Sequence, residues 1–202
     1  MPNDCQGVCI DRRWGLAEYR PTVRLLKGNP NINVTKEEVE LLYEYDRWAN
    51  KRAFQAAVAL SAEQFTRDLG SSFKSVRDTL AHNCDVEWLW LERFHGRSHS
   101  ALPPVAKYAD LAALRARWED VERDLTDFIA SLTDADLARV YEFKTMSGAA
   151  QAQPGWQMLQ HLANHGTYHR GQIATMLRQL GAKGQGTDMI IFYRDRAARA
   201  TA

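Results

Sequence analysis

The chain has 202 residues, of which 45% are hydrophobic and 10% aromatic, a length and composition that suit one globular domain and exclude a disordered chain. Its 26 basic residues balance 25 acidic ones, for a formal net charge of +1, so the charge does not point to nucleic acid or to an anionic membrane as partner. No apolar run approaches the roughly 20 residues that span a bilayer, which excludes a membrane-spanning helix.

Residues 1–34 are expected to form an N-terminal extension. The run Lys-Gly-Asn-Pro-Asn at residues 27–31 favours a turn that would end any earlier element. The start lacks the apolar segment of a secretory signal, and three cysteines, an odd number, argue against a disulfide framework. We therefore expect a cytoplasmic protein. Cys5 and Cys9 are interpreted as two free thiols, with a bridge or a metal pair as the alternative.

Four amphipathic helices are predicted to follow, in a domain over residues 35–195 with a tail over residues 196–202. The first covers residues 35–60 and begins with a capping box of Thr35 and Glu38. The second covers residues 75–94, with Ser75 as its N-cap. The third, over residues 110–132, is apolar on one face and charged on the other. The fourth begins near Pro154 and ends before Gly181.

Shorter elements are predicted between and after these helices. Residues 133–137 resemble a short capped turn. Residues 140–146 alternate in strand fashion, and Ser147 and Gly148 can turn a small hairpin before the last long helix. Residues 188–193 are short and apolar and are expected to pack across one end of the bundle. The predicted fold class is all-α, a four-helix bundle with this hairpin added.

Three histidines share one side of the fourth helix. His161, His165 and His169 fall at i, i+4 and i+8, and four residues advance about 6 Å in slightly more than one turn. His165 and His169 lie in or beside the apolar stripe of the helix, whereas His161 lies toward its rim. Two imidazoles facing the interior each need a partner, and one metal ion supplies it to both. The alternative is one core histidine bonded to a carbonyl and one in solvent.

His82 favours the metal. It lies in the middle of the most apolar helix, and a third ligand from a facing helix would give three protein ligands with open coordination positions, the arrangement of a catalytic metal site. Imidazole ligands suit a divalent transition metal, here Zn, Ni, Fe or Mn. Three polar residues are near enough in sequence to orient the ligands: Asp85, Glu87 and Gln172. The alternative is that these residues are solvated or cap a neighbouring group.

The remaining histidines and the helical cysteine are interpreted as bystanders. His95 and His99 fall in a loop and are expected to be solvated. Cys84 follows His82 by two residues, so it points about 200° away from it on a helix. A buried structural thiol is therefore favoured over a nucleophile.

Three stretches carry a resemblance to a known family: residues 45–50 (YDRWAN), residues 78–90 with their DTLAH and EWLW segments, and residues 161–172 (HLANHGTYHRGQ). Over residues 38–195 the sequence resembles the DinB family, also described as DinB/YfiT-like metalloenzymes. The resemblance implies an up-down-down-up four-helix bundle, often a homodimer. It also implies a metal held by His82, His165 and His169, without His161.

The resemblance also implies a reaction. Relatives with a known activity resemble thiol transferases, which use a low-molecular-weight thiol such as bacillithiol, mycothiol or glutathione. A metal that binds the thiol lowers its pKa and presents a thiolate to an electrophile. We therefore hypothesise a metal-dependent transferase or isomerase for a small-molecule substrate, in detoxification or stress response. The alternatives are a metal-dependent hydrolase, for which no carboxylate stands out as the base, and a non-enzymatic metal-binding stress protein.

Overall fold

The computed structural model describes residues 34–201. The expected extension, apart from its last residue, lies outside this range, and so do Cys5 and Cys9. Within it, four long helices lie side by side: α1 (Lys36–Ala57), α3 (Val76–Phe94), α4 (Leu111–Ser131) and α6 (Gly155–Gln179). α6 packs against α1 and α3, and α4 packs against the other sides of the same two helices. The predicted four-helix bundle is confirmed.

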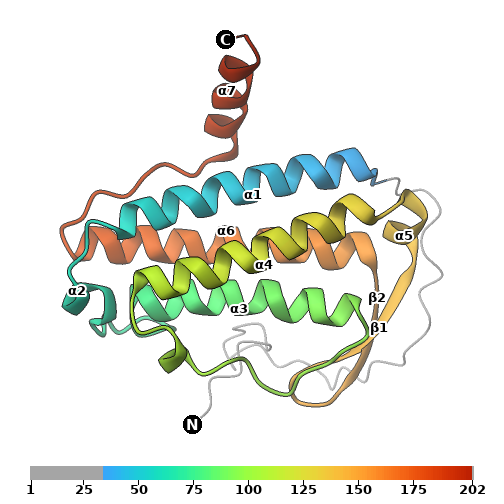
Figure 1. Cartoon of the computed structure of the whole chain (residues 1–202), viewed down its shortest axis with the longest axis horizontal. Coiled ribbons are helices and arrows are strands. Elements are labelled where there is room, and N and C mark those ends of the chain that lie inside the picture. The colour runs from blue at the N-terminus through green and yellow to red at the C-terminus, as the bar shows by residue number, and fades with distance from the viewer. Residues whose placement is uncertain (1–33, 202) are drawn as a thin grey trace, which may run out of the picture.

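In chain order, the four long helices run up, down, down and up. α3 and α4 run in the same direction, and α1 and α6 run opposite to them (Figure 1). Two parallel neighbours need a long connection, and the loop from α3 to α4 crosses the length of the bundle with only a short 3-10 turn at Val105–Lys107. α3 and α6 are therefore antiparallel neighbours, which matters for the site described below.

The helix ends follow the local sequence signals. The backbone N–H of Thr35 donates to the Glu38 carboxylate at 2.9 Å, and the Thr35 hydroxyl accepts from the N–H of Glu38. The Ser75 hydroxyl accepts from the N–H of Asp78 in the same way. α1 ends a little before the expected residue 60, because a second capping box at Ser61 and Gln64 starts the short helix α2 (Ala62–Thr66), which was not predicted.

The hairpin before the last long helix is also confirmed. After the short helix α5 (Asp134–Ala138), strands β1 (Val140–Lys144) and β2 (Ala150–Pro154) pair antiparallel, with Lys144 opposite Ala150. Gly148 adopts a φ of +88° in the turn, a conformation that glycine reaches without steric cost. Pro154 ends β2 and precedes α6, whereas the sequence placed it in the first helical turn.

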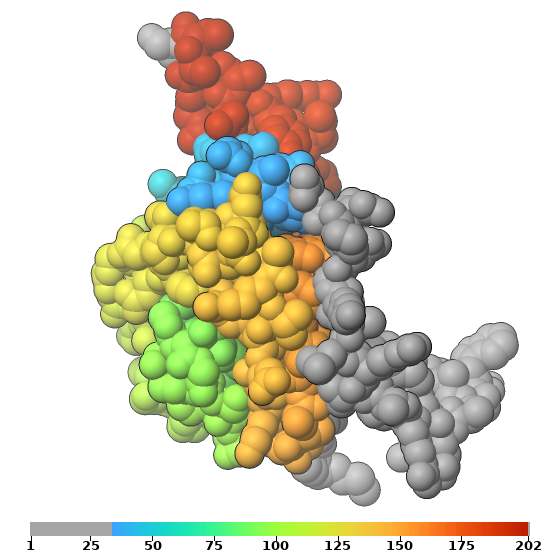
Figure 2. Space-filling model, turned by 90° about the vertical axis from the view of Figure 1, so that its right-hand side faces the viewer, coloured from blue at the N-terminus to red at the C-terminus, as the bar shows by residue number. Residues whose placement is uncertain are grey.

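The last apolar segment differs from the prediction. Instead of a short piece across the bundle end, it opens α7 (Met189–Ala200), a helix that stands out from the bundle on the α1 side (Figure 1, Figure 2). Phe192 is its one buried residue, and its ring centroid lies 5.8 Å from those of Tyr45 and Trp48. Met189, Ile190 and Tyr193 stay exposed. Across residues 34–201, the structure contains no helix that is long and apolar enough to cross a membrane.

Candidate metal centre

The three predicted histidines meet where α3 faces α6. The Nε2 atom of His165 lies 3.2 Å from Nε2 of His82 and 3.0 Å from Nε2 of His169, and the possible ligand atoms of all three lie within 4.8 Å of one another. Two nitrogens bound to one ion at about 2.1 Å, with about 90–110° between the bonds, would lie about 3.0–3.4 Å apart. The nitrogens are thus spaced as a shared ion requires.

Hydrogen bonds alone do not satisfy this arrangement. A neutral imidazole nitrogen either donates one proton or accepts through one lone pair, yet Nε2 of His165 faces the Nε2 atoms of both His82 and His169. A cation at the point of convergence would accept a lone pair from each ring. The donor set therefore fits a transition-metal ion.

The surroundings keep the three rings neutral, which is the form that binds metal. Burial, together with the nearby His169, lowers the pKa of His82 to about 3. Burial also lowers the pKa of His165 to about 2, with the three neighbouring histidine rings adding to the effect. The pKa of His169 is lowered by burial as well, although the hydrogen bond with Gln172 opposes the shift.

Two contacts orient the rings. The Oε1 atom of Gln172 lies 2.8 Å from Nδ1 of His169, so Nδ1 donates and Nε2 is left with its lone pair toward the cluster. The ring of Phe73 stacks on His82 with 4.0 Å between centroids. No sequence signal singled out Phe73. Nδ1 of His165 is buried without a hydrogen-bond partner.

The other candidates for an orienting role lie elsewhere. Asp85 accepts a hydrogen bond from the Tyr108 hydroxyl. Glu87 accepts one from the Trp118 indole N–H at 2.9 Å. Of the three residues considered from the sequence, only Gln172 contacts a cluster histidine.

Three histidines were not expected to bind the metal: His161, His95 and His99. The exposed ring of His161 lies 6.1 Å from that of His165 and packs on Trp90, outside the cluster. His95 is exposed as predicted, and His99 is partly exposed, with its Nε2 2.9 Å from the Glu92 carboxylate.

Cys84, the remaining bystander, is fully buried. Burial raises the pKa of its thiol well above its ordinary range. A thiol that stays protonated at neutral pH is a poor nucleophile, in keeping with a structural role.

A buried polar network links the helices through the bundle interior. The Nη1 atom of Arg170 donates to Asp46 at 2.6 Å and to the amide oxygen of Asn50 at 2.7 Å. The Asn50 amide nitrogen donates in turn to Asp46 and to Glu87. All four side chains belong to residues no more than 4% exposed. The network joins α1, α3 and α6, and through Trp118 it reaches α4.

This network accounts for residues that the sequence left without a role. Asp46 and Asn50 belong to the 45–50 stretch, and Arg170 follows His169 directly. Gly166 gives the network room, because an added Cβ would lie 2.9 Å from Nη1 of Arg170 and 3.0 Å from Oδ1 of Asp46. A fixed network on one face of α6 holds the rotation of that helix, and thereby the direction of His165 and His169.

Two hollows of similar size lie at different distances from the cluster. One, of 480 Å³, runs between the residue 69–71 loop and α6, and Gln172 and Tyr168 line it. The Tyr168 ring lies 5.1 Å from that of His169, so this hollow adjoins the cluster. Its lining side chains are apolar or uncharged.

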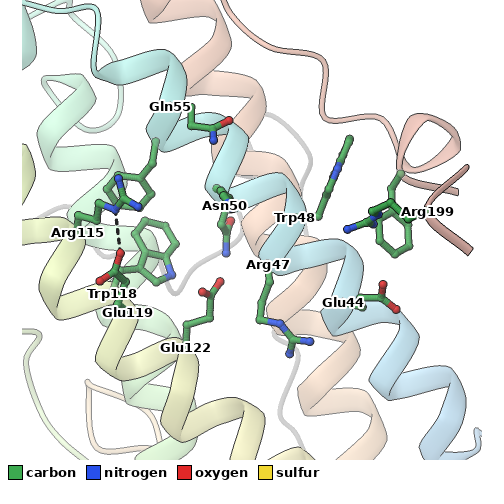
Figure 3. Close-up of a pocket in the computed structure, with 13 residues that line it drawn as sticks. Glu44, Arg47, Trp48, Asn50, Gln55, Arg115, Trp118, Glu119, Glu122 and Arg199 are labelled. Atoms are coloured by element: carbon green, nitrogen blue, oxygen red, sulfur yellow. Dashed lines mark hydrogen bonds and ion pairs between the residues drawn. The ribbon is translucent and has the colours of Figure 1, made fainter. Parts of the chain in front are cut away.

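The other hollow, of 470 Å³, opens between α1 and α4. Figure 3 shows Trp48, Trp118 and Glu122 around it, with Asn50 behind. Burial raises the pKa of Glu122 to about 7. No cluster histidine lines this hollow. No cluster histidine lines the hollow at α6 either, but two of its lining residues, Tyr168 and Gln172, contact His169, so it is the one of these two hollows that adjoins the cluster.

Comparison with known proteins shows the family to which the chain belongs. The model of the DinB family matches residues 32–198. The chain belongs to the DinB family. Protein DinB of Bacillus subtilis (strain 168) is 32% identical over 152 residues, which cover 73% of this chain and 88% of that protein. The three clustered histidines all lie inside the family match.

Two solved structures share the fold. A DinB-like protein from Bacillus cereus ATCC 10987 superposes with a TM-score of 0.61 at 18% identity, covering 77% of this chain and 99% of the other. YfiT from Bacillus subtilis, described as a probable metal-dependent hydrolase with an unusual four-helix bundle topology, gives a TM-score of 0.57 at 17% identity. That match covers 75% of this chain and 93% of YfiT.

Proposed function

We propose that this DinB-family chain binds one divalent transition-metal ion through His82, His165 and His169 and uses it to transfer a low-molecular-weight thiol to a small electrophile. The observation that carries the proposal is the convergence of three neutral Nε2 atoms at 3.0 and 3.2 Å. Three protein ligands leave coordination positions open for a substrate. The metal would supply Lewis acidity, which lowers the pKa of a coordinated thiol.

The chain's own residues would hold and orient the reactants. Gln172 would keep the lone pair of His169 directed at the ion, and Phe73 restricts the ring of His82. The uncharged hollow along α6 would receive one of the two reactants. No protein group needs to remove the thiol proton, because coordination itself favours its release to solvent.

The composition of the cluster supports the thiol over water as nucleophile, because no carboxylate among the described residues belongs to it. Hydrolysis by a three-ligand metal site ordinarily needs a base near the attacking water. Within residues 34–201 the cluster contains histidines only, and the Asp85 and Glu87 carboxylates are engaged with Tyr108 and Trp118. A hydrolase is nevertheless the second candidate, favoured by the description of YfiT. A non-enzymatic metal-binding stress protein is the third.

One experiment separates these functions. Elemental analysis of untagged protein should find about one metal equivalent per chain, and a His165→Ala, His169→Ala double variant should lose it. The Co(II)-loaded protein should then develop an intense near-ultraviolet charge-transfer band with bacillithiol, mycothiol or glutathione and conjugate that thiol to an electrophile. Ester or amide hydrolysis without such a band would establish the hydrolase instead. If the protein catalyses neither reaction, the non-enzymatic role would remain.

A further inference from the structure

Arg93, on α3, is a buried cation without a counter-ion. The residue is 2% exposed, and its Nε and Nη2 atoms are buried without any hydrogen-bond partner. No ion pair links it to a carboxylate in the part of the chain that the structure describes. Buried charges in proteins are ordinarily paired, because leaving water without a partner is unfavourable. The position therefore calls for an anion.

The neighbours of Arg93 are aromatic. Its guanidinium carbon lies 4.4 Å from the Trp90 ring centroid and 4.9 Å from that of Phe143, on β1. Ring faces attract a cation but leave its N–H donors unsatisfied. The adjacent carboxylate, Glu92, is engaged with Arg97 and His99. The pKa of Arg93 is lowered by burial to about 10, so the side chain is still charged at neutral pH.

Arg93 lies in line with the histidine cluster. It follows His82 by 11 residues, which places the two within about 20° of one helix face and about 16 Å apart along the axis. On the antiparallel α6, His161 bridges the interval, with its ring 5.1 Å from Trp90 and 6.1 Å from His165. His161 is exposed and Trp90 is partly exposed, so a surface strip of His161 and Trp90 connects the cluster to Arg93.

We propose that Arg93 binds the carboxylate of the same small molecule whose other end reacts at the histidine cluster. The proposal rests on the function proposed above and adds a substrate class: an extended molecule with a carboxylate roughly 10 Å or more from its metal-binding atom, given the helical interval and the reach of an arginine side chain. The carboxylate would displace the half-buried ring of Phe143 and form the charge-assisted hydrogen bonds that Nε and Nη2 lack.

A short and a long thiol test the proposal. Mercaptopropionate and mercaptooctanoate are titrated into the Co(II)-loaded protein, each beside the alcohol of the same length, and the near-ultraviolet band is followed. For wild type we expect mercaptooctanoate to bind at least about tenfold more tightly than mercaptooctanol, an ordinary effect of a buried charged pair. Mercaptopropionate is too short to reach Arg93 and should show no such preference.

The variants assign the effect to one side chain. Arg93→Met should abolish the preference for the long acid, and Arg93→Lys should retain part of it. Arg139→Met is the matched control, since Arg139 also lies over a ring, 4.3 Å from the Tyr141 centroid, but is solvent-exposed and near Asp136. It should leave the preference unchanged. An equal preference in wild type and Arg93→Met, or no preference in wild type, overturns the proposal.

A titration without metal tests the Arg93 anion site independently of the thiol chemistry. Octanoate and octanol are titrated by calorimetry into chelator-treated wild type and Arg93→Met. If no thiol gives a band but octanoate binds wild type at least about tenfold more tightly than Arg93→Met, the anion site stands and the proposed transferase does not. Equal binding of octanoate to both proteins overturns the anion site. Arg93→Met should unfold at the same or a higher temperature, because it removes an unpaired buried charge; a lower Tm counts against the proposal.

Discussion

Replacing Gly166 by alanine should destabilise the protein by disturbing the buried network of Asp46, Asn50, Glu87 and Arg170. The new methyl carbon would lie 2.9 Å from Nη1 of Arg170 and 3.0 Å from Oδ1 of Asp46, at an ion pair that is itself 2.6 Å long. Both side chains are almost fully buried, so neither can move into solvent. We expect the methyl group to push the pair apart.

The magnitude follows from two opposing effects. Breaking a buried ion pair costs about 3–5 kcal/mol when one charge is left unpaired, and a partial displacement costs less. Alanine in a helix interior recovers about 1 kcal/mol relative to glycine. The free energy of unfolding should therefore fall by about 1–3 kcal/mol. Because the network holds the rotation of α6, the metal affinity of the adjacent His165 should fall as well.

Gly171→Ala is the matched control. Gly171 lies on the same helix, and no atom lies within 4 Å of a Cβ added there. This variant should gain up to about 1 kcal/mol from helix propensity alone. Urea unfolding of both variants without metal measures the difference. Equal free energies of unfolding for Gly166→Ala and Gly171→Ala would refute the view that the network is tightly packed against Gly166.

Four further predictions concern the site, the pH response, the extension and assembly. His82→Ala should lower metal affinity strongly, whereas His161→Ala should change it little, as equilibrium dialysis with elemental analysis would show; the reverse order would contradict the proposed ligand set. In chelator-treated protein, stability should decrease as the pH falls below about 6.5, because His82 and His165 take up protons in the unfolded chain there but in the folded chain only near pH 3 and 2. His82→Ala should flatten that dependence, and an unchanged slope in urea titrations would argue against it. Deleting residues 1–30 should leave a folded, metal-binding domain, since the start of α1 is capped by Thr35 and Glu38; circular dichroism and metal analysis check this, and insoluble protein would contradict it. A homodimer is expected from the family, and light scattering would show it; if the exposed face of α7 contributes, Ile190→Glu should shift the protein to monomer.

The sequence alone determined the features that depend on neighbouring residues. The N-cap side chains of Thr35 and Ser75 each bond to the residue three positions later in the chain. The starts of α1 and α3 could therefore be predicted from the local sequence. The spacing of His165 and His169 likewise places both on one helix face. The position of His82 in the most apolar helix suggested a third ligand, and the resemblance of the chain to the DinB family implied the same residue and added the topology.

Tertiary structure decided what depends on partners distant in the chain. That His82 meets His165 at 3.2 Å follows from the packing of α3 against α6, which no local pattern specifies. Arg170 and Asp46 are 124 residues apart, and a periodic pattern indicates that a polar residue is buried without naming its partner. The same holds for Arg93, whose lack of a counter-ion becomes visible only when every neighbour is in place. Hydrophobic periodicity reports which face is buried, whereas charge pairing depends on the three-dimensional positions of a few atoms.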